Sequence, residues 1–391
     1  MAKLIEITGK ALSGEWGTDD ETGCGIPVLR TTNFTNEGIV NYRNVVTRTI
    51  TKKKIAEKYL RQGDIIIEKS GGSDKQPVGR VIYFDGPDST YLFNNFTGLL
   101  RVKDRNVWYP RYVFYSLFFN YRRGGTKAFE NKTTGLHNLK VDDYVSRCEV
   151  RVENIQKQVA ICEQLDRIFD IIRARQQQLQ KLDELIKARF IELFGDPMTD
   201  ISKWSTSTIG EQFNVTSGGT PATGEKAYWE NGTIPWIGSN MCQDTILSGN
   251  DGKFITEEGY THSSAKWFHK GTVLVALVGA TIGKTALLRF DTTTNQNIAA
   301  IDVNNNVAFS SEFVFYHMQM LYSKFMEIGS GKFKMANQGF IRQLPLICPP
   351  IELQDQFAAF VEQTDKSKSV VQKALDEAQL LFDSLMQQYF G

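Results

Sequence analysis

IQKQVAICEQLDRIFDIIRARQQQLQKLDELIKARFIELF, residues 155–194, is a run of forty residues that contains neither glycine nor proline. Its apolar residues recur at intervals of three, four or seven, and they include Ile161, Leu165, Ile168, Ile172, Leu179, Leu182 and Ile186. This heptad spacing is typical of a helix that pairs along one apolar seam in a coiled coil. Forty residues at about 1.5 Å each make a helix of roughly 60 Å, and Gly195-Asp196-Pro197 ends it.

A second run of the same kind closes the chain at residues 351–391, and Pro349-Pro350 precedes it as a helix start. We expect the two helices to pair antiparallel, because a chain that alternates globular domain and helix twice closes most simply in that way. The alternative is two unrelated surface helices. The residues predicted to pair the helices are Leu165, Ile168, Ile172, Leu179, Leu182, Ile186, Val371, Ala378, Leu381 and Leu385.

The chain also repeats itself once, with a period near 200 residues, which indicates two copies of a domain. In matching order, residues 25–34 resemble 233–242, 60–72 resemble 268–280, 111–121 resemble 312–322, 153–168 resemble 351–366, and 194–195 resemble 390–391. Paired residues of the two copies, Pro27 with Pro235, Gly63 with Gly271 and Asn33 with Asn240, are expected to build the shared frame.

Each copy opens with a stretch rich in Gly, Asn and Thr that contains short β-branched runs, which favours a mixed, strand-rich domain. The sequence therefore predicts an α+β fold in which two similar globular domains are separated by two long antiparallel coiled-coil helices, with a pseudo-two-fold relation between the halves. The predicted boundaries are 1–150 for the first domain, 151–195 for the first helix, 196–350 for the second domain and 351–391 for the second helix.

The overall composition excludes several classes of protein. Hydrophobic residues are 41% and charged residues 23% of the 391, as in ordinary globular proteins. No apolar run approaches the roughly 18 residues that span a bilayer, so no membrane association is expected. The five cysteines are scattered and form no CxxC pair, which argues against a disulfide framework and favours the cytoplasm.

The charge is distributed unevenly along the chain. Residues 1–145 carry 22 Lys and Arg against 16 Asp and Glu, whereas residues 351–391 carry 3 against 7. The net charge of +1 therefore hides a basic excess in the first domain. A basic patch of this kind can meet phosphate even when the whole chain is neutral.

Catalytic motifs are missing from the sequence. Residues 279–285, GATIGKT, resemble a phosphate-binding loop, but three residues separate the glycines where four are needed, so we expect a turn between two strands. The four histidines show no metal-ligand spacing, and neither a metal nor another cofactor is expected. No methyltransferase tetrapeptide of the Asn-Pro-Pro-Tyr type and no nuclease acidic cluster is present, so we expect no catalytic residues and a binding or organising role.

Double-stranded DNA is the expected ligand, because two similar domains on a fixed spacer suit a ligand of regular spacing. Polar turns that follow strands carry side chains that can donate hydrogen bonds to phosphates and base edges. The predicted DNA-binding residues are Lys69, Ser70, Ser73, Lys75, Gln76, Arg122, Arg123, Lys127, Thr281, Lys284, Lys332, Lys334, Asn337 and Gln338. The turns at 30–33, 238–240 and 295–297 are of the same kind. The lysine run at 52–54 is instead expected to be a solvated surface.

Residues 182–197, 278–285, 293–297 and 344–354 carry a resemblance to a known family. The whole chain resembles the specificity (S) subunit of type I DNA restriction–modification enzymes. The resemblance implies two target-recognition domains that each read one half of a split DNA sequence. It also implies two helices that set the gap and dock two methyltransferase (M) subunits, with restriction (R) subunits joining the complex. The first repeat departs from the family pattern at residues 151–158, where the proline pair is lost.

The resemblance thus implies a non-catalytic reader and scaffold. Two other readings remain. One is an enzyme, a fused nuclease or methyltransferase, which would need the catalytic motifs that the sequence lacks. The other is a coiled-coil protein-interaction adaptor without sequence-specific DNA binding.

Overall fold

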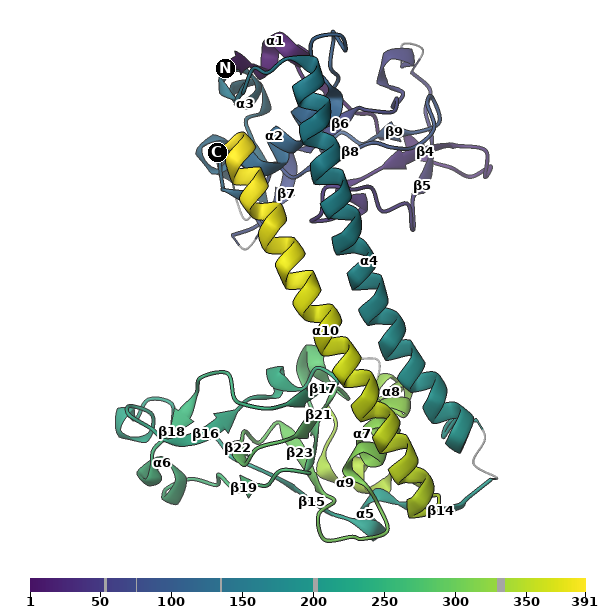
Figure 1. Ribbon diagram of the computed structural model, residues 1–391, viewed down its shortest axis with the longest axis vertical. Coiled ribbons are helices and arrows are strands. Elements are labelled where there is room, and N and C mark those ends of the chain that lie inside the picture. The colour runs from purple at the N-terminus through teal and green to yellow at the C-terminus, as the bar shows by residue number, and fades with distance from the viewer. Residues whose placement is uncertain (53–54, 75, 134–135, 200–202, 329–334) are drawn as a thin grey trace. The chain divides into compact units, whose positions relative to one another are not determined.

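A computed structural model describes the chain except for residues 53–54, 75, 134–135, 200–202 and 329–334 (Figure 1). The chain divides into two compact units, the first made of residues 1–176 and 373–391 and the second of residues 177–372. Two long helices, α4 (Ile155–Phe194) and α10 (Ile351–Phe390), are drawn in teal and yellow in Figure 1. The boundary between the units falls inside both helices, so each unit holds one globular domain and part of each helix.

The first domain is built on an antiparallel sheet whose central strand is buried on both faces. Its strand order is β2 (Leu12–Ser13), β10 (Thr97–Leu100), β6 (Ile65–Glu68) and β8 (Val81–Tyr83). In β6, Ile65 and Ile67 join the core under helix α2 (Pro110–Arg122), while Ile66 faces a second core. Burial on both faces explains why the strand is an unbroken apolar run instead of an alternating one.

The second domain repeats this arrangement with one strand more. Its sheet has the order β15 (Asn214–Ser217), β23 (Ile298–Asp302), β20 (Val273–Ala276), β21 (Thr285–Leu288) and β17 (Thr245–Leu247), with β17 parallel to β21. Val273 and Val275 face the core under helix α7 (Ser311–Met320), and Leu274 faces the opposite core.

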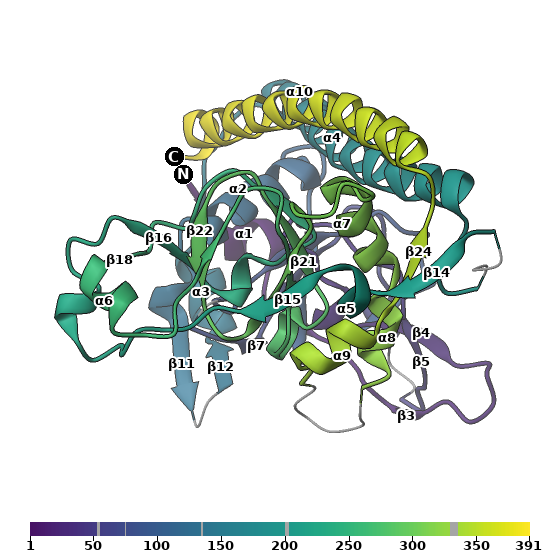
Figure 2. The same ribbon diagram turned by 90° about the horizontal axis from the view of Figure 1, so that it is seen from below.

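A smaller sheet that includes one parallel pair lies beside each main sheet. In the first domain it comprises β3 (Thr18–Asp19), β5 (Val46–Thr49), β4 (Ile26–Leu29) and β9 (Leu92–Phe93), and β4 is parallel to β9. In the second it comprises β18 (Phe254–Ile255), β16 (Ile234–Ile237), β22 (Thr292–Thr294) and β19 (Trp267–Phe268), and β16 is parallel to β22. Figures 1 and 2 both show β18 and the short helix α6 (Glu257–Thr261) on the side of the main sheet away from α7.

Each domain is closed by a two-stranded pair just before its long helix. The first pair is β1 (Ala2–Lys3) with β13 (Glu149–Val150), and the second is β14 (Ser205–Thr208) with β24 (Pro345–Cys348). A further sheet of the first domain joins β7 (Ser70–Gly72), β12 (Leu136–Leu139) and β11 (Glu130–Thr133). The remaining helices are α1 (Leu4–Thr8), α3 (Val141–Arg147), α5 (Ile209–Gln212), α8 (Tyr322–Met326) and α9 (Gln338–Gln343).

The long helices pair antiparallel, as the alternation of globular domain and helix along the chain predicts. In the first unit, the rings of Phe169 and Phe382 lie 6.1 Å apart between centroids, and the Tyr389 hydroxyl donates to Gln164 Oε1 at 2.8 Å. In the second unit, Lys368 Nζ lies 2.7 Å from Asp183 Oδ1. Later residues of α10 thus meet earlier residues of α4 in both units.

Most of the residues predicted to pair the helices face inward. Buried ones are Leu165, Ile168, Ile172, Ile186, Val371 and Leu385, and half-buried ones are Leu179, Leu182 and Ala378. The prediction for Leu381 is wrong, because this side chain is 50% exposed while its neighbour Phe382 is 2% exposed. Phe382 packs on both α4 and Tyr115 of α2, so the buried face of α10 is rotated away from a simple two-helix seam.

A buried glutamine fixes the start of each long helix in the same way. Gln158 accepts a hydrogen bond from Tyr109 N and donates to the carbonyl oxygens of Val107 and Glu153, at 2.8–2.9 Å. Its counterpart in α10 makes the corresponding three bonds: Gln354 accepts from Ser310 N and donates to the carbonyl oxygens of Ala308 and Pro349. The repeat of 153–168 in 351–366 is therefore displaced by two residues from the expected alignment.

Candidate nucleic-acid interface

Four of the predicted DNA-binding residues of the first domain line one pocket. Helix α2 ends at Arg122, and Gly124, with φ of +81°, turns the chain back so that the cations on either side of it converge. Gln76 reaches the same pocket and donates from Nε2 to Asn36 Oδ1 at 2.9 Å. The pocket is lined by Asn36, Gln76, Pro77, Tyr121, Arg122, Arg123, Gly124 and Lys127.

The electrostatic character of this pocket is positive. Among the described residues, its lining has three cations and no carboxylate. Arg122 is anchored by an ion pair with Asp383 of α10, at 2.6 Å between Nη1 and Oδ1, and the Arg123 guanidinium lies 5.4 Å from the Phe119 ring centroid. Among the described residues, no carboxylate forms an ion pair with Lys127, so the pocket can accept an anion such as a phosphate.

Three of the predicted residues near β6 and β7, Lys69, Ser70 and Ser73, are held by hydrogen bonds or strand pairing. Ser73 Oγ accepts from Gln76 N at 3.1 Å, and Ser70 lies in β7 opposite Asn138. Lys69 Nζ donates to Ser13 Oγ at 2.9 Å. Burial lowers the pKa of Lys69, and the charge of Lys58 adds to this effect, whereas the charge of Asp142 opposes it. Lys75 lies outside the described residues.

The described residues predicted to bind DNA in the second domain form hydrogen bonds or ion pairs within that domain. Residues 279–285 form a turn between β20 and β21, as expected, with Thr281 accepting from Lys284 N. Lys284 Nζ lies 2.5 Å from Asp244 Oδ2 and 4.8 Å from the Tyr322 ring centroid, so a phosphate would have to compete with Asp244. This partner lies forty residues away along the chain, and no local pattern reveals it.

Two further residues of the second domain stabilise the start of α9. Asn337 Oδ1 accepts from Phe340 N at 2.8 Å and caps the helix. Gln338 Nε2 donates to Ser217 Oγ at 2.9 Å. Lys332 and Lys334 lie outside the described residues.

The frame that carries these turns is the same in both domains. A Cβ on Gly14 would lie 2.1 Å from Asn94 O, and one on Gly218 would lie 2.1 Å from Thr294 O, so both positions require glycine. Gly63 and Gly271, which the sequence pairs, have φ of +92° and +90°. These are left-handed conformations that favour glycine.

The pairing of Asn33 with Asn240 is wrong by one residue. Asn33 ends the short 3₁₀ turn Thr31–Asn33, whose counterpart is the turn Ser239–Met241, so Asn33 corresponds to Met241. Asn33 is buried, with Oδ1 accepting from Arg30 N and Nδ2 donating to Asn41 O, whereas Asn240 is exposed. Asn33 is thus a frame residue, but Asn240 is a surface residue.

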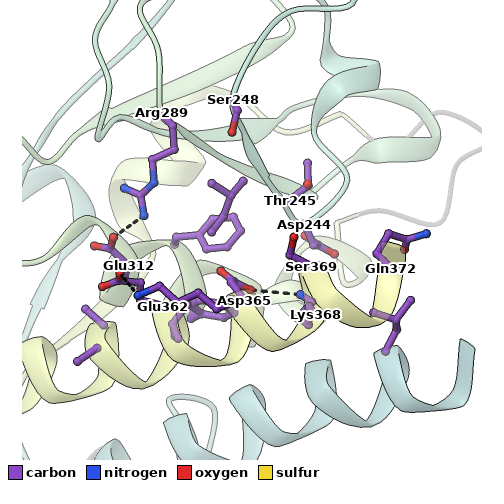
Figure 3. Close-up of a pocket in the computed structure, with 18 residues that line it drawn as sticks. Asp244, Thr245, Ser248, Arg289, Glu312, Glu362, Asp365, Lys368, Ser369 and Gln372 are labelled. Carbon is purple, nitrogen blue, oxygen red and sulfur yellow. Dashed lines mark hydrogen bonds and ion pairs between the residues drawn. The ribbon is translucent and has the colours of Figure 1, made fainter. Parts of the chain in front are cut away.

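A groove in the second unit runs along α10 beside α7 and β17 (Figure 3). Its charged residues all have partners: Arg289 pairs with Glu312, Lys366 with Glu362, Lys368 with Asp365 and Asp183, and Asp244 with Lys284. Neither histidine nor cysteine is among its described lining residues. Its charges nearly balance, so the groove lacks the positive character of the pocket around Gly124.

Two further features bear on function within the described parts of the chain. No group of three or more His, Cys, Asp or Glu side chains is placed to hold a metal ion. None of the described helices combines the length and the apolar character needed to cross a membrane.

Comparison with known proteins defines the class. The family described as the type I restriction modification DNA specificity domain matches residues 2–184 and 201–379, and the chain belongs to this family, with one copy of the domain in each repeat. A relative from Escherichia coli, the type I restriction enzyme EcoR124I/EcoR124II specificity subunit, is 27% identical over 171 residues, which are 42% of this chain and 41% of that protein. The chain thus matches less than half the length of this relative.

Two other comparisons cover almost the whole chain. A Methanocaldococcus jannaschii protein described as the specificity subunit of the type I restriction enzyme MjaX is 20% identical over 397 residues, 96% of this chain and 89% of that protein. The crystal structure of the type I restriction–modification S subunit from M. genitalium aligns with a TM-score of 0.55 and 16% identity, covering 100% of this chain and 95% of that one. At this identity the structural likeness establishes a common fold.

Proposed function

We propose that the chain is the non-catalytic DNA-recognition subunit of a type I restriction–modification complex. Each globular domain then reads one half of a bipartite target in double-stranded DNA. The proposed division is residues 1–150 and 196–350 for the target-recognition domains, and residues 151–195 and 351–391 for the helices that set the spacer between half-sites.

One observation carries this proposal: the two domains share a frame but not a surface. Both domains share the same hydrogen bonds at the start of the long helix, made by Gln158 and Gln354. They also share the same close backbone approach at Gly14 and Gly218. The turns that they support differ, with cations gathered around Gly124 in the first domain and the internally paired Lys284 in the second. Two readers of different half-sites require this combination, since the frame positions the protein and the turns supply base and phosphate contacts.

The proposed protein partners are two M subunits on the long helices and R subunits in the full complex. Exposed apolar side chains on the helices support a docking role, because apolar side chains that the fold leaves in solvent can be buried against a partner. These side chains are Ile171, Leu185, Val370, Leu380 and Leu381. We place the complex in the cytoplasm, which agrees with five free cysteines and no disulfide among them.

The test is the methylation pattern that the assembled complex produces. The chain is co-expressed with the M subunit of its system, the complex is purified, and plasmid DNA carrying random inserts is methylated and read by modification-sensitive sequencing. We expect one bipartite motif whose two halves are separated by a fixed gap. The chain alone should not bind S-adenosylmethionine. Methylation without a bipartite motif, or cofactor binding by the isolated chain, would contradict the proposal.

A further inference from the structure

The turn between β9 and β10 displays an aromatic side chain that the fold does not use. Thr97 closes the turn by donating from both its backbone N and its Oγ1 to Asn94 O, at 3.1 and 2.8 Å. Asn94 and Thr97 are buried, but Phe96 between them is 53% exposed. A phenylalanine on a rigid, closed turn is therefore held out into solvent at a fixed place.

A lysine is joined to this phenylalanine through the backbone. Lys69 N donates to Phe96 O at 2.8 Å, which fixes the two residues to each other. The Lys69 ammonium is held by the Ser13 hydroxyl, and no carboxylate forms an ion pair with it among the described residues. Its cationic neighbour Lys58 already shares Glu15 with Lys52. This edge of the first domain thus combines an exposed aromatic ring with a half-buried lysine that forms no ion pair among the described residues, although the charge of Asp142 acts on it.

The second domain has the same backbone at this place with other side chains. Leu277 N donates to Asn297 O at 2.9 Å, in the place of the Lys69–Phe96 bond. The next connection is repeated as well, since Leu139 N donates to Lys69 O and Ala336 N donates to Leu277 O, both at 2.8 Å. Phe96 therefore corresponds to Asn297 and Lys69 to Leu277. One backbone frame presents an aromatic–cation pair in one domain and an amide–aliphatic pair in the other.

We propose that this turn is a base-reading element in each domain, with Phe96 making an apolar contact to a base of the first half-site and Lys69 binding the adjacent phosphate. Asn297 takes the position of Phe96 at the second half-site. The inference rests on the proposed function and adds the residues that determine which bases each half-site contains. An apolar side chain can read a thymine methyl group or wedge between base steps, and an amide can read an adenine edge. The fixed backbone lets either side chain act without a change in the frame.

The experiment compares point variants in the complex with M subunits. Wild type, Phe96→Ala, Lys69→Gln and Asn297→Phe are tested for the methylated motif on plasmid DNA with random inserts, and for affinity to a duplex carrying the wild-type motif. We expect Phe96→Ala to weaken binding about tenfold or more and to relax one position of the first half-site only. Asn297→Phe should change the second half-site only. Lys69→Gln should weaken binding to all sequences and lower the salt dependence by about one unit of slope.

The matched control is Val107→Ala, since Val107 is an equally exposed apolar residue of the same domain outside this turn. It should leave motif and affinity unchanged. The inference is overturned if Phe96→Ala keeps the wild-type motif and affinity. It is also overturned if Phe96→Ala loses its M subunits in size-exclusion chromatography while the residual methylation keeps the same motif, because Phe96 would then contact protein. A wild-type complex that methylates no bipartite motif would instead overturn the proposed function itself.

Discussion

At the scale of single residues, His317 makes the stability of the second unit depend on pH. Its ring is buried against Phe313 and Phe190, and Nε2 bonds Pro345 O at 2.9 Å. Burial lowers the pKa of His317 to about 4, and the bond to Pro345 offsets this only in part. The unfolded chain has a histidine pKa of about 6.5 and so binds the proton first as pH falls. Stability present above pH 6.5 should therefore be lost towards pH 4, by about 3 kcal/mol.

Denaturant unfolding followed at several pH values checks this prediction. The equivalent residue of α2 is Ser116, which provides the matched variant His317→Ser. This variant should be less stable at pH 7, because it leaves a cavity, but its second unit should show a much smaller change between pH 7 and pH 4. An unaltered pH dependence in the variant would assign the effect to other groups.

The glutamines at the helix starts make a second residue-scale prediction. Gln158→Leu removes three hydrogen bonds from the buried Gln158 side chain to the backbone of Tyr109, Val107 and Glu153, and a hydrogen bond of this kind contributes about 0.5–1.5 kcal/mol. We expect a loss of roughly 2–4 kcal/mol in the free energy of unfolding, measured by denaturant titration. Gln156→Leu is the control, because Gln156 is exposed on the same helical turn, although the sequence alignment pairs Gln156 with Gln354. Equal losses in the two variants would contradict the register seen here.

At the scale of elements, the sequence predicts the existence and limits of the long helices better than their packing. Residues 155–194 contain neither glycine nor proline, so local sequence alone predicts an uninterrupted helix over this range. Near the end of α10 the buried face departs from the predicted heptad positions, because this segment packs on α2 as well as on α4. Heptad spacing within one helix cannot predict a contact with a third helix. Similarly, the apolar run at 65–67 predicts a strand, but the order of strands depends on pairing between distant segments.

The same principle applies to the candidate interface. The cations around Gly124 are neighbours in the chain, so their convergence could be predicted from sequence. The pairing of Lys284 with Asp244, and the contact of Lys69 with Phe96, depend on the folded sheets and could not.

The packing of α10 yields a prediction at the element scale. Phe382→Ala removes a buried ring from contact with Phe169 and Tyr115, and such truncations cost about 3–5 kcal/mol. Leu381→Ala should change the free energy of unfolding by less than about 0.5 kcal/mol, because the side chain is half exposed. Thermal or denaturant melting of the two variants measures the difference. Leu381→Ala should instead weaken assembly with the M subunit. A large loss of stability in this variant would show that Leu381 pairs the helices, as the heptad spacing predicts.

At the scale of the whole molecule, the duplicated frame predicts that specificity is modular. Residues 1–145 carry the basic excess and the pocket around Gly124. They join the first long helix through the hydrogen bonds of Gln158, and Gln354 makes the equivalent bonds in the second repeat. Replacing them with the same domain of another family member should change one half-site of the methylated motif and leave the other half and the gap intact. Sequencing of methylated DNA gives the answer directly. A change in both half-sites would show that the domains do not read independently.

The last prediction concerns the gap between the half-sites. If α4 and α10 set this gap, lengthening both helices should lengthen it. The boundary between the two units falls after Gln176 in α4 and after Gln372 in α10, so insertions at these two points leave each unit's own contacts unchanged. Four residues in each helix add about 6 Å and turn the following seam by only about 40°, because the helix repeats every 3.6 residues. At about 3.4 Å per base pair, the gap should grow by one or two pairs.

Two inserted residues in each helix are the control, since they add about 3 Å but turn the seam by about 200°. The buried residues Ile186 and Val371 would then lie on a different side of their helices from the buried residues beyond the insertion. We expect this variant to lose assembly with the M subunit, whereas the four-residue variant assembles and methylates a motif with a longer gap. Size-exclusion chromatography and methylation sequencing measure the two outcomes. A stable four-residue variant that methylates the wild-type motif would show that the helices do not act as the spacer.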